Sequence, residues 1–439
     1  MNQFTEYLRQ AEFSLAAYAY LSTLEPDIHE LTKAQMTISQ ATAFASKWIV
    51  AKQYNHSVTE EVPVYDDGGN ITSYITRTLS NGLSVTVFED AETGERHVAI
   101  RGTEITDLGD LTADGGILLH GTPNLSDQYQ SLKSKIEEWQ VNGVLADPFS
   151  VTGHSLGGWL ASGLALEFAD SIEHTYLYNS PGIVESGSDG LLQQLKDALG
   201  ISAEPTLNLD NVSNIRASAG NFVISGLGYA LSEPIQIFTE DQTQSDVPDK
   251  PLARNHSQRV LMDSLAVYAL FGEISSAFSL ETMGSLLKAS GNRNAMTLES
   301  AVNALGDLFL AGGEITAVDN REDLYARIQA IRGTAAYQAA TQAQDFISIE
   351  SLAGSTDGEM TAKAMQKSPE GMAHRYALSR LTPFVILGDE SLFDGHNANG
   401  QLELYDAASG TGELSEHYLR DRAAMLSWKM KFDTVAMDD

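Results

Sequence analysis

A Gly-His-Ser-Leu-Gly-Gly segment at residues 153–158 restricts the fold of this 439-residue chain more than any other feature. A short run, Phe-Ser-Val-Thr at residues 149–152, precedes it, and an apolar segment of helical character follows over residues 159–168. This order predicts a strand that turns sharply into a helix, with Ser155 at the bend. A serine held there has a strained backbone, and flanking side chains would collide with the neighbouring strand and helix, which explains the glycines.

The rest of the first 275 residues fits a sheet built around that strand. Apolar and β-branched runs predict further strands at residues 174–178, 214–218 and 234–238, and a helix over residues 258–270. Such alternation favours a mostly parallel sheet with helices on both faces. Upstream, helical spacing predicts two helices, over residues 4–18 and 28–52. Short β-branched runs separated by Asn-Gly and Thr-Gly turns then predict an antiparallel meander of three strands, over residues 70–79, 83–89 and 97–101.

Beyond residue 275 the chain is alanine-rich and its spacing is helical. The predicted elements are helices over residues 301–310, 321–330, 360–381 and 413–430, and one strand over residues 383–387. We therefore predict an α/β chain with two parts. Residues 1–275 form an α/β-hydrolase domain around a mostly parallel central sheet, and residues 276–439 form a mainly helical C-terminal extension, either separate or packed on the first part.

Charge and composition exclude several classes of function. The chain has 27 Lys and Arg against 59 Asp and Glu, a net charge of −32, so nucleic acid is not expected as a partner. Cysteine is absent, which excludes disulfides, thiolate zinc sites and a cysteine nucleophile. No apolar run is long enough to span a membrane. Charged residues interrupt the first 12 positions, so we expect either secretion without an N-terminal signal peptide or a cytoplasmic location.

A serine hydroxyl needs a general base to act as a nucleophile. In hydrolases with this bend, an acid and then a histidine follow the serine along the chain. His174 lies in a predicted strand too soon after Ser155, whereas His256 lies in a loop between the last predicted strand and a helix. We therefore predict Ser155 as the nucleophile and His256 as the base. Three later histidines fall in the helical tail, where surface or packing roles are expected: His374, His396 and His417.

The acid of this triad has several candidates. The usual position, after the penultimate strand, holds Asn221, whose amide cannot stabilise an imidazolium by charge. We favour Asp241, because it ends the last predicted strand beside the His256 loop. Other carboxylates near strand ends stay open as alternatives: Asp210, Glu240, Asp246 and Asp249.

The oxyanion of an acyl-transfer intermediate needs two N–H donors. One is the backbone of Leu156, directly after the nucleophile. The second donor would come from Arg-Gly-Thr at residues 101–103, where an apolar strand ends and the glycine allows the backbone to approach the oxyanion closely. We therefore predict the backbone N–H of Thr103 as the second donor. Asp110 and Asp114 would hold this loop by accepting hydrogen bonds from Thr103.

Together these segments resemble the class 3 lipases, and most closely the bacterial lipase-like domains of large repeat-in-toxin secreted proteins. The likeness spans roughly residues 10–275 and is most specific over residues 79–114 and 149–170. Lys-Trp-Ile-Val at residues 47–50 and Asn-His-Ser at residues 255–257 also fit it. The resemblance implies a serine carboxylic-ester hydrolase that acts on acyl esters or lipids and needs no cofactor.

For individual residues, the resemblance implies that Ser155 forms an acyl-enzyme, that His256 is the base, and that Thr103 and Leu156 hold the oxyanion. The family usually has an aspartate where this chain has Asn221, so the acid departs from its pattern. Phospholipase A1 action and acyl transfer are variants of the same chemistry. The alternative of another class is a non-catalytic lipase-like domain that binds lipid or a partner, its triad broken at Asn221.

Two further segments bear on substrate and cofactor. In such lipases a lid follows the oxyanion loop. The apolar, glycine-bounded segment at residues 117–121 therefore makes residues 107–130 the lid candidate. Its apolar side would be the part of the chain that contacts a lipid surface. A plain surface helix is the other interpretation. An oxygen-rich loop at residues 394–400 leaves calcium open, although it lacks the first ligand of an EF-hand.

Overall fold

The computed structural model of the chain describes residues 2–21, 24–65, 71–102, 125–181, 193, 195–197, 199–202, 209–218, 231–239, 256–291, 297–310, 318 and 320–435. These residues form two compact units. The sheet unit contains the described parts of residues 10–235 together with residues 256–259. The helical unit contains residues 2–9, residues 236–239 and the described residues from 260 onward.

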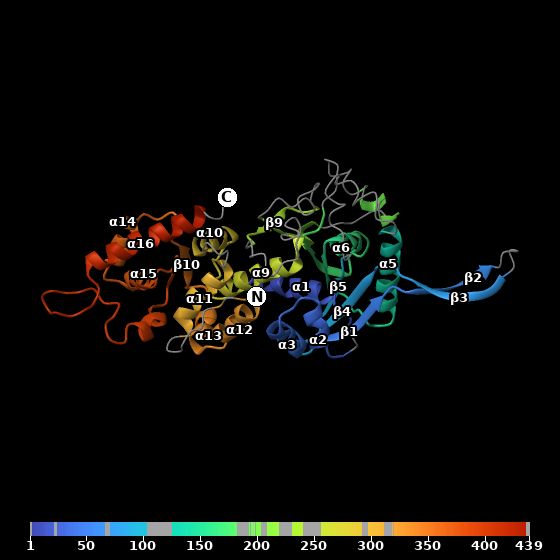
Figure 1. The fold of residues 1–439 in the computed structure, drawn as a ribbon, viewed down its shortest axis with the longest axis horizontal. Helices are drawn as coiled ribbons and strands as arrows, with labels where there is room; N and C mark the ends of the chain where they lie inside the picture. Colours follow the sequence, from blue (N-terminus) through green and yellow to red (C-terminus); the bar gives the residue numbers. More distant parts are fainter. Residues whose placement is uncertain are drawn as a thin grey trace. The chain divides into compact units, whose positions relative to one another are not determined.

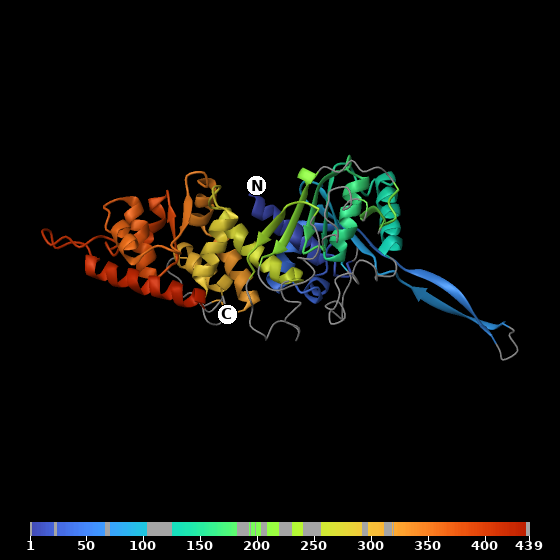
Figure 2. The ribbon, with the colours of Figure 1, turned by 90° about the horizontal axis from the view of Figure 1, so that it is seen from above.

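The central sheet of the sheet unit has seven described strands (Figures 1 and 2). Neighbouring strands follow the order β1 (Trp48–Asn55), β4 (Ser84–Asp90), β5 (Arg96–Ile100), β6 (Phe149–His154), β7 (Ile172–Tyr178), β8 (Val212–Ala217) and β9 (Pro234–Ile237). The pairs β1–β4 and β4–β5 are antiparallel, whereas β5–β6, β6–β7 and β7–β8 are parallel. The predicted α/β fold with a mostly parallel sheet is confirmed, and the antiparallel pairs β1–β4 and β4–β5 lie together at one edge.

Helices cover both faces of this sheet, because successive side chains of each strand point to opposite faces. The helices of the unit are α1 (Gln3–Ala16), which enters it at Gln10, α2 (Ile28–Lys33), α3 (Ile38–Lys47), α5 (Leu125–Val141) and α6 (Leu156–Glu167), with a short 3-10 turn η2 (Leu209–Asn211). On one face, Tyr129 of α5 and Leu160 of α6 share a buried core with Val98. On the other face, Phe13 of α1 stacks on Phe88 and on the imidazole of His97.

The prediction of one helix over residues 28–52 is wrong. Two helices, α2 and α3, are followed directly by strand β1. Thr37 caps α3 through a capping box with Gln40, which starts the second helix afresh. From Trp48 on, aromatic and β-branched residues pair with β4, Trp48 lying opposite Asp90. Sheet pairing therefore overrides the helical spacing of the last residues of this segment.

The predicted meander is also corrected. Strand β3 (Ile71–Leu79) pairs antiparallel with β2 (Val58–Tyr65), which the sequence pattern did not predict, and not with β4. Figures 1 and 2 show β2 and β3 as a ribbon that extends away from the helices of its unit. The remaining two strands of the meander, β4 and β5, pair as expected.

The helical unit consists mainly of helices and one small sheet. Its elements are the end of β9, α9 (Gln258–Gly272) from Val260 on, α10 (Leu280–Ser290), α11 (Thr297–Phe309), α12 (Arg321–Arg332), α13 (Ala335–Gln342), β10 (Ser348–Ser351), α14 (Asp357–Ala364), α15 (Pro369–Arg380), β11 (Phe384–Leu387), η4 (Glu390–His396) and α16 (Glu416–Val435). In the described part of the chain, no helix is both long and apolar enough to cross a membrane.

The predicted single helix over residues 360–381 is two helices. Pro369 lies in the first turn of α15 and Ser368 caps it by accepting from the N–H of Gly371, so a new helix begins there. The pattern also missed strand β10, whose Ser348 lies opposite Leu387 of β11.

The bounds of the two units differ from the predicted domains 1–275 and 276–439. Phe4, near the start of α1, packs edge-on against Tyr268 of α9 and against Phe278. The Asn2 amide donates to the carbonyl of Gly272. Aromatic packing thus joins the first residues of the chain and most of α9 to the C-terminal helices.

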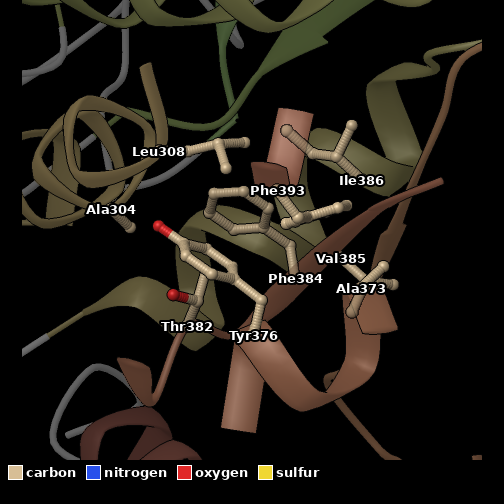
Figure 3. A pocket seen from close by; sticks show the side chains of 9 residues that line it. All are labelled: Ala304, Leu308, Ala373, Tyr376, Thr382, Phe384, Val385, Ile386 and Phe393. Atoms are coloured by element: carbon tan, nitrogen blue, oxygen red, sulfur yellow. The ribbon is translucent and has the colours of Figure 1, made fainter. Parts of the chain in front are cut away.

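A small pocket in the helical unit is lined by side chains of α11, α15, β11 and η4 (Figure 3). Its lining is apolar except for the hydroxyl groups of Tyr376 and Thr382. The described lining of this pocket includes no carboxylate, imidazole or amine.

Candidate active site

Ser155 occupies the bend between β6 and α6, in the strand–turn–helix arrangement that the spacing predicts. It is the N-cap of α6 with φ 54° and ψ −125°, a backbone conformation that residues other than glycine rarely adopt. Its N–H donates to the carbonyl of Tyr178 at 2.9 Å, which ties the bend to the next strand. The Ser155 side chain makes no capping hydrogen bond to α6, so Oγ is available for another partner.

The glycines around Ser155 are required by close backbone approach. A Cβ on Gly153 would lie 2.3 Å from the carbonyl oxygen of Gly157, and one on Gly157 would lie 2.3 Å from the carbonyl oxygen of Ile100. A Cβ on Gly158 would lie 2.8 Å from Cβ of Ser180. All three distances are shorter than carbon–oxygen or carbon–carbon contacts allow, so each position is restricted to glycine.

The side chains of Ser155 and His256 meet at this bend. Nε2 of His256 lies 2.8 Å from Oγ of Ser155, and both residues are buried, with 7% and 2% of their surface exposed. Burial, and to a lesser degree repulsion from His154, lowers the pKa of His256 well below its ordinary value. The imidazole is therefore neutral at pH 7, and its Nε2 can accept the serine proton.

A second imidazole, that of His154, contacts the backbone of His256. Its Nε2 lies 2.7 Å from the carbonyl oxygen of His256, and its Nδ1 lies 3.0 Å from the hydroxyl of Tyr18. A carbonyl oxygen only accepts, so Nε2 carries the hydrogen and Nδ1 accepts from Tyr18. Burial lowers the pKa of His154 to about 4, an effect that its hydrogen bond to His256 partly offsets.

Asn179 also contacts the His256 carbonyl, its amide Nδ2 donating to that oxygen at 3.3 Å. Neither His154 nor Asn179 was predicted as a site residue. The signal for His154 was its place inside the glycine-rich segment, and the signal for Asn179 was its place at the end of the strand after Ser155. His154 ends β6 and Asn179 directly follows β7, so both lie at the edge of the parallel strands where Ser155 lies.

Of the two predicted oxyanion donors, Leu156 lies within the described residues and Thr103 lies outside them. Leu156 is the first residue of α6, where a backbone N–H has no acceptor within its own helix and the positive end of the helix dipole lies. Gly102, two residues after the end of β5, lies against the bend, since a Cβ there would be 2.6 Å from the carbonyl oxygen of His154 and 3.4 Å from Cβ of Ser155. Gly102, the residue before Thr103, thus lies beside Ser155.

Several predicted residues lie outside the described part of the chain: Thr103, Asp110, Asp114, Asn221, Glu240, Asp241, Asp246 and Asp249, with the lid candidate up to residue 124. Residues 125–130 of that candidate begin α5. Asp210, the remaining alternative for the acid, lies in η2 just before β8 and is exposed. Because β8 runs parallel to β7, Asp210 lies at the amino edge of these strands, opposite the edge that carries Ser155.

The other histidines that follow Ser155 have contacts away from the bend. His174 lies 2.8 Å, through Nε2, from the hydroxyl of Ser213 on the neighbouring strand. In the helical unit, His374 and His396 each donate to a backbone carbonyl. The side chain of His417 is 83% exposed. These contacts agree with the packing and surface roles expected of the three tail histidines.

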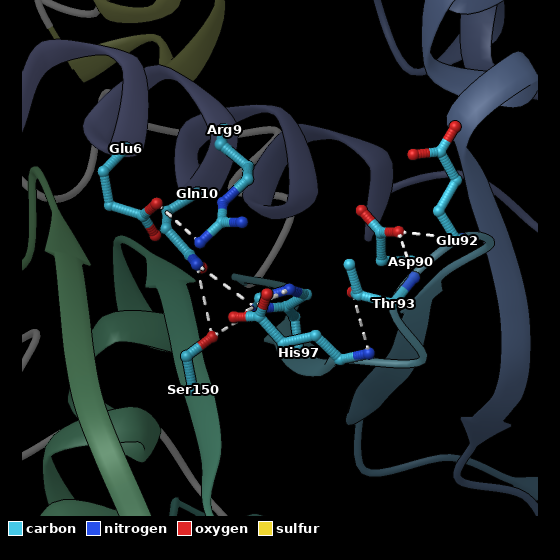
Figure 4. A network of polar contacts seen from close by, with 9 residues as sticks. Glu6, Arg9, Gln10, Asp90, Glu92, Thr93, His97 and Ser150 are labelled. Atoms are coloured by element: carbon cyan, nitrogen blue, oxygen red, sulfur yellow. Dashed lines mark hydrogen bonds and ion pairs between the residues drawn. The ribbon is translucent and has the colours of Figure 1, made fainter. Parts of the chain in front are cut away.

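A buried polar network fixes β6 against α1 beneath the bend (Figure 4). The Gln10 amide donates to Oγ of Ser150 at 3.2 Å, and Nδ1 of His97 lies 2.6 Å from the same oxygen. Thr152 donates to the backbone carbonyl of Gln10 at 3.1 Å. Paired polar groups of this kind lock the register of the strand that ends at Ser155.

The described residues contain no group of three or more His, Asp or Glu side chains that would hold a metal ion. In the loop at residues 394–400, the amide of Asn397 donates to Glu403, and its oxygen accepts from the N–H of Leu402. Calcium binding there stays a prediction.

Comparisons with known proteins add a structural likeness. No family model matches the chain, and no curated protein matches it. Among solved structures, the chain is similar to a triacylglycerol lipase from Penicillium expansum, with 16% identity and a TM-score of 0.25. The match covers 54% of this chain and 79% of the lipase chain.

Proposed function

We propose that the protein is a serine carboxylic-ester hydrolase of the α/β-hydrolase type, with Ser155 as nucleophile and His256 as general base. The observation that carries the proposal is the 2.8 Å approach of His256 Nε2 to Ser155 Oγ at a strained strand-to-helix bend. A serine with an imidazole in hydrogen-bond reach is the arrangement that acyl transfer requires. We also propose membership of the class 3 lipase-like group, with the hydrolase domain over residues 1–275.

The reaction would begin when Nε2 of His256 takes the proton of Ser155 Oγ as this oxygen attacks the acyl carbonyl carbon. The N–H groups of Leu156 and, as proposed, Thr103 would hold the oxyanion of the tetrahedral intermediate. Its collapse breaks the ester bond, and the leaving alcohol takes the proton from His256. Water then gives a proton to His256, attacks the acyl-enzyme and releases the carboxylic acid, returning the proton to Ser155.

Two further parts of the mechanism are proposals that rest mainly on residues outside the described ranges. Asp241 would orient His256 and stabilise the imidazolium. Residues 107–130 would form a lid whose apolar side contacts acyl chains or a lipid surface. The substrates would accordingly be acyl esters or lipids, and the reaction needs no cofactor.

A fluorophosphonate, which reacts with activated serines, tests the nucleophile. It should label the wild-type protein at Ser155, as read by mass spectrometry of the labelled peptide, and should leave S155A unlabelled. Folded protein that takes up no label would contradict the proposal. It would favour a non-catalytic lipase-like domain that binds lipid or a partner.

A substrate panel tests the reaction class. Nitrophenyl esters from short to long acyl chains, triacylglycerol emulsions and phospholipid vesicles should separate esterase, lipase and phospholipase A1 activity. Added alcohol would reveal acyl transfer as a new ester product. Vesicle binding that persists in S155A, without turnover by the wild type, would support the binding alternative.

A further inference from the structure

The backbone carbonyl of the proposed base is held by two side chains from two different strand ends. His154, at the end of β6, donates to the His256 oxygen at 2.7 Å, and Asn179, just after β7, donates to it at 3.3 Å. A residue in the loop before α9 is thereby fixed to the rigid edge of the sheet. The stronger of these contacts comes from the residue that directly precedes the nucleophile.

Both donors are themselves held in place. His154 pairs with Tyr178 in the β6–β7 ladder, so its backbone cannot shift independently of the sheet. Asn179 has φ 44°, and its N–H donates to the carbonyl of Ile215 at 2.9 Å. Its side-chain oxygen accepts from the N–H of Ala217 at 3.0 Å. The amide of Asn179 is therefore oriented with its Nδ2 toward His256.

Tyr18 selects the tautomer of His154 that can donate. Its hydroxyl lies 3.0 Å from Nδ1, and a Cβ on Gly102 would lie 2.6 Å from the same hydroxyl, so Tyr18 packs closely against the bend. With Nδ1 accepting from Tyr18, the hydrogen of a neutral His154 belongs on Nε2, which faces the carbonyl of His256. Burial, which lowers the pKa of His154 to about 4, keeps this imidazole neutral at pH 7.

We infer that His154 is a positioning residue for the base: Tyr18 fixes its tautomer, and its Nε2–H holds the backbone of His256 so that the imidazole of His256 reaches Ser155. This inference rests on the proposed function. Small displacements of a catalytic group lower kcat strongly, because the reacting geometry is lost while substrate binding is retained.

Two variants at position 154 test this inference by kinetics. H154L keeps most of the side-chain volume and removes the donor, whereas H154Q keeps an amide donor near the position of Nε2. We expect H154L to lower kcat about 10- to 100-fold with KM unchanged, and H154Q to recover most of that loss. H174L, which removes a histidine that bonds to Ser213 on the neighbouring strand, is the matched control and should keep wild-type kcat.

The thermal unfolding midpoint of each variant separates positioning from stability. The inference is overturned if H154L turns over at the wild-type rate, if H154Q is no better than H154L, or if H174L loses kcat to the same extent at an equal unfolding midpoint. A fall in kcat that follows the unfolding midpoint across the three variants would also overturn it.

Histidine nitrogen NMR distinguishes failure of this inference from failure of the proposed function. In wild-type protein labelled with ¹⁵N-histidine, His154 should be neutral at pH 7 with hydrogen on Nε2 and none on Nδ1, and Y18F should perturb its Nδ1 resonance. A charged His154, or hydrogen on Nδ1, overturns the inference whether or not the protein hydrolyses esters. If the wild type hydrolyses no ester and takes up no fluorophosphonate, the proposed function is wrong. In that case the tautomer of His154 still tests whether its Nε2–H holds the backbone carbonyl of His256.

Discussion

Nε2 of His256 lies 2.8 Å from Oγ of Ser155, although the two residues are 101 positions apart in the chain. The contact is formed inside one compact unit, because residues 256–259 belong to the sheet unit. Removal of either side chain should therefore remove the same chemistry.

We expect S155A and H256N each to lower ester hydrolysis by about 10⁶-fold, since a serine and its base act as one unit and their losses are not additive. The measurement is kcat/KM on a nitrophenyl ester, with the double variant no worse than either single one. S162A is the matched control, because Ser162 is a buried serine of the same helix whose hydroxyl donates to the carbonyl of Gly158. Equal losses in S162A would point to damage to the fold.

A side chain at Gly157 should disrupt the bend. The Cβ of G157A would lie 2.3 Å from the carbonyl oxygen of Ile100, which belongs to the sheet and cannot move away cheaply. We expect the free energy of unfolding to fall by about 1–3 kcal/mol and activity to fall with it. G284A is the control, since a Cβ on Gly284 in α10 meets nothing within 4 Å. An alanine there should stabilise its helix by about 0.5–1 kcal/mol.

The acid limb of the pH profile should lie below pH 6.5. Burial disfavours the charged imidazolium, so the pKa of His256 in the folded protein is lower than its ordinary value of 6.5. Protonation removes the acceptor at Nε2 only when the pH falls through this lowered pKa, and activity should persist to that point. The limb is read from kcat/KM, which reports the free protein. A half-maximal point above pH 6.5 would contradict this prediction: the carboxylate proposed at Asp241 would then raise the pKa of His256 more than burial lowers it.

For the acid, D241N and D210N should differ. Because Asp241 is proposed to orient His256, D241N should lower kcat by about 10⁴-fold, with the unfolding midpoint unchanged. D210N should retain wild-type kcat, because Asp210 is exposed at the opposite edge of the parallel strands. Wild-type activity in D241N would remove Asp241 from the triad, and D246N and D249N would then be compared in the same assay.

Much of the fold around Ser155 was predictable because it depends on local sequence. The apolar run before the glycines, the glycines themselves and the helical spacing after them specify β6, the bend and α6. The predictions of secondary structure were wrong where the choice of strand partner determines the structure. Residues 48–52 continue a helical pattern yet join the sheet as β1, and β3 pairs with β2 in a separate ribbon.

The residues of the candidate site also fall into two groups: those that the sequence predicts and those that only the structure reveals. The sequence indicated Ser155 and His256 through chain order and loop position, and the structure brings them together. Chain position alone put His154 inside the glycine-rich segment and Asn179 at a strand end, but their roles depend on which backbone carbonyl lies next to them. That carbonyl belongs to His256, 102 positions after His154 and 77 after Asn179.

The sequence by itself determined the sharp bend at residues 153–158, since only glycine tolerates the backbone approach on either side of Ser155. Only the tertiary structure decided which histidine reaches that serine, in which orientation it is held, and which neighbours lower its pKa. These properties depend on distances between strand ends and a distant loop, which side-chain packing sets and which no local pattern encodes.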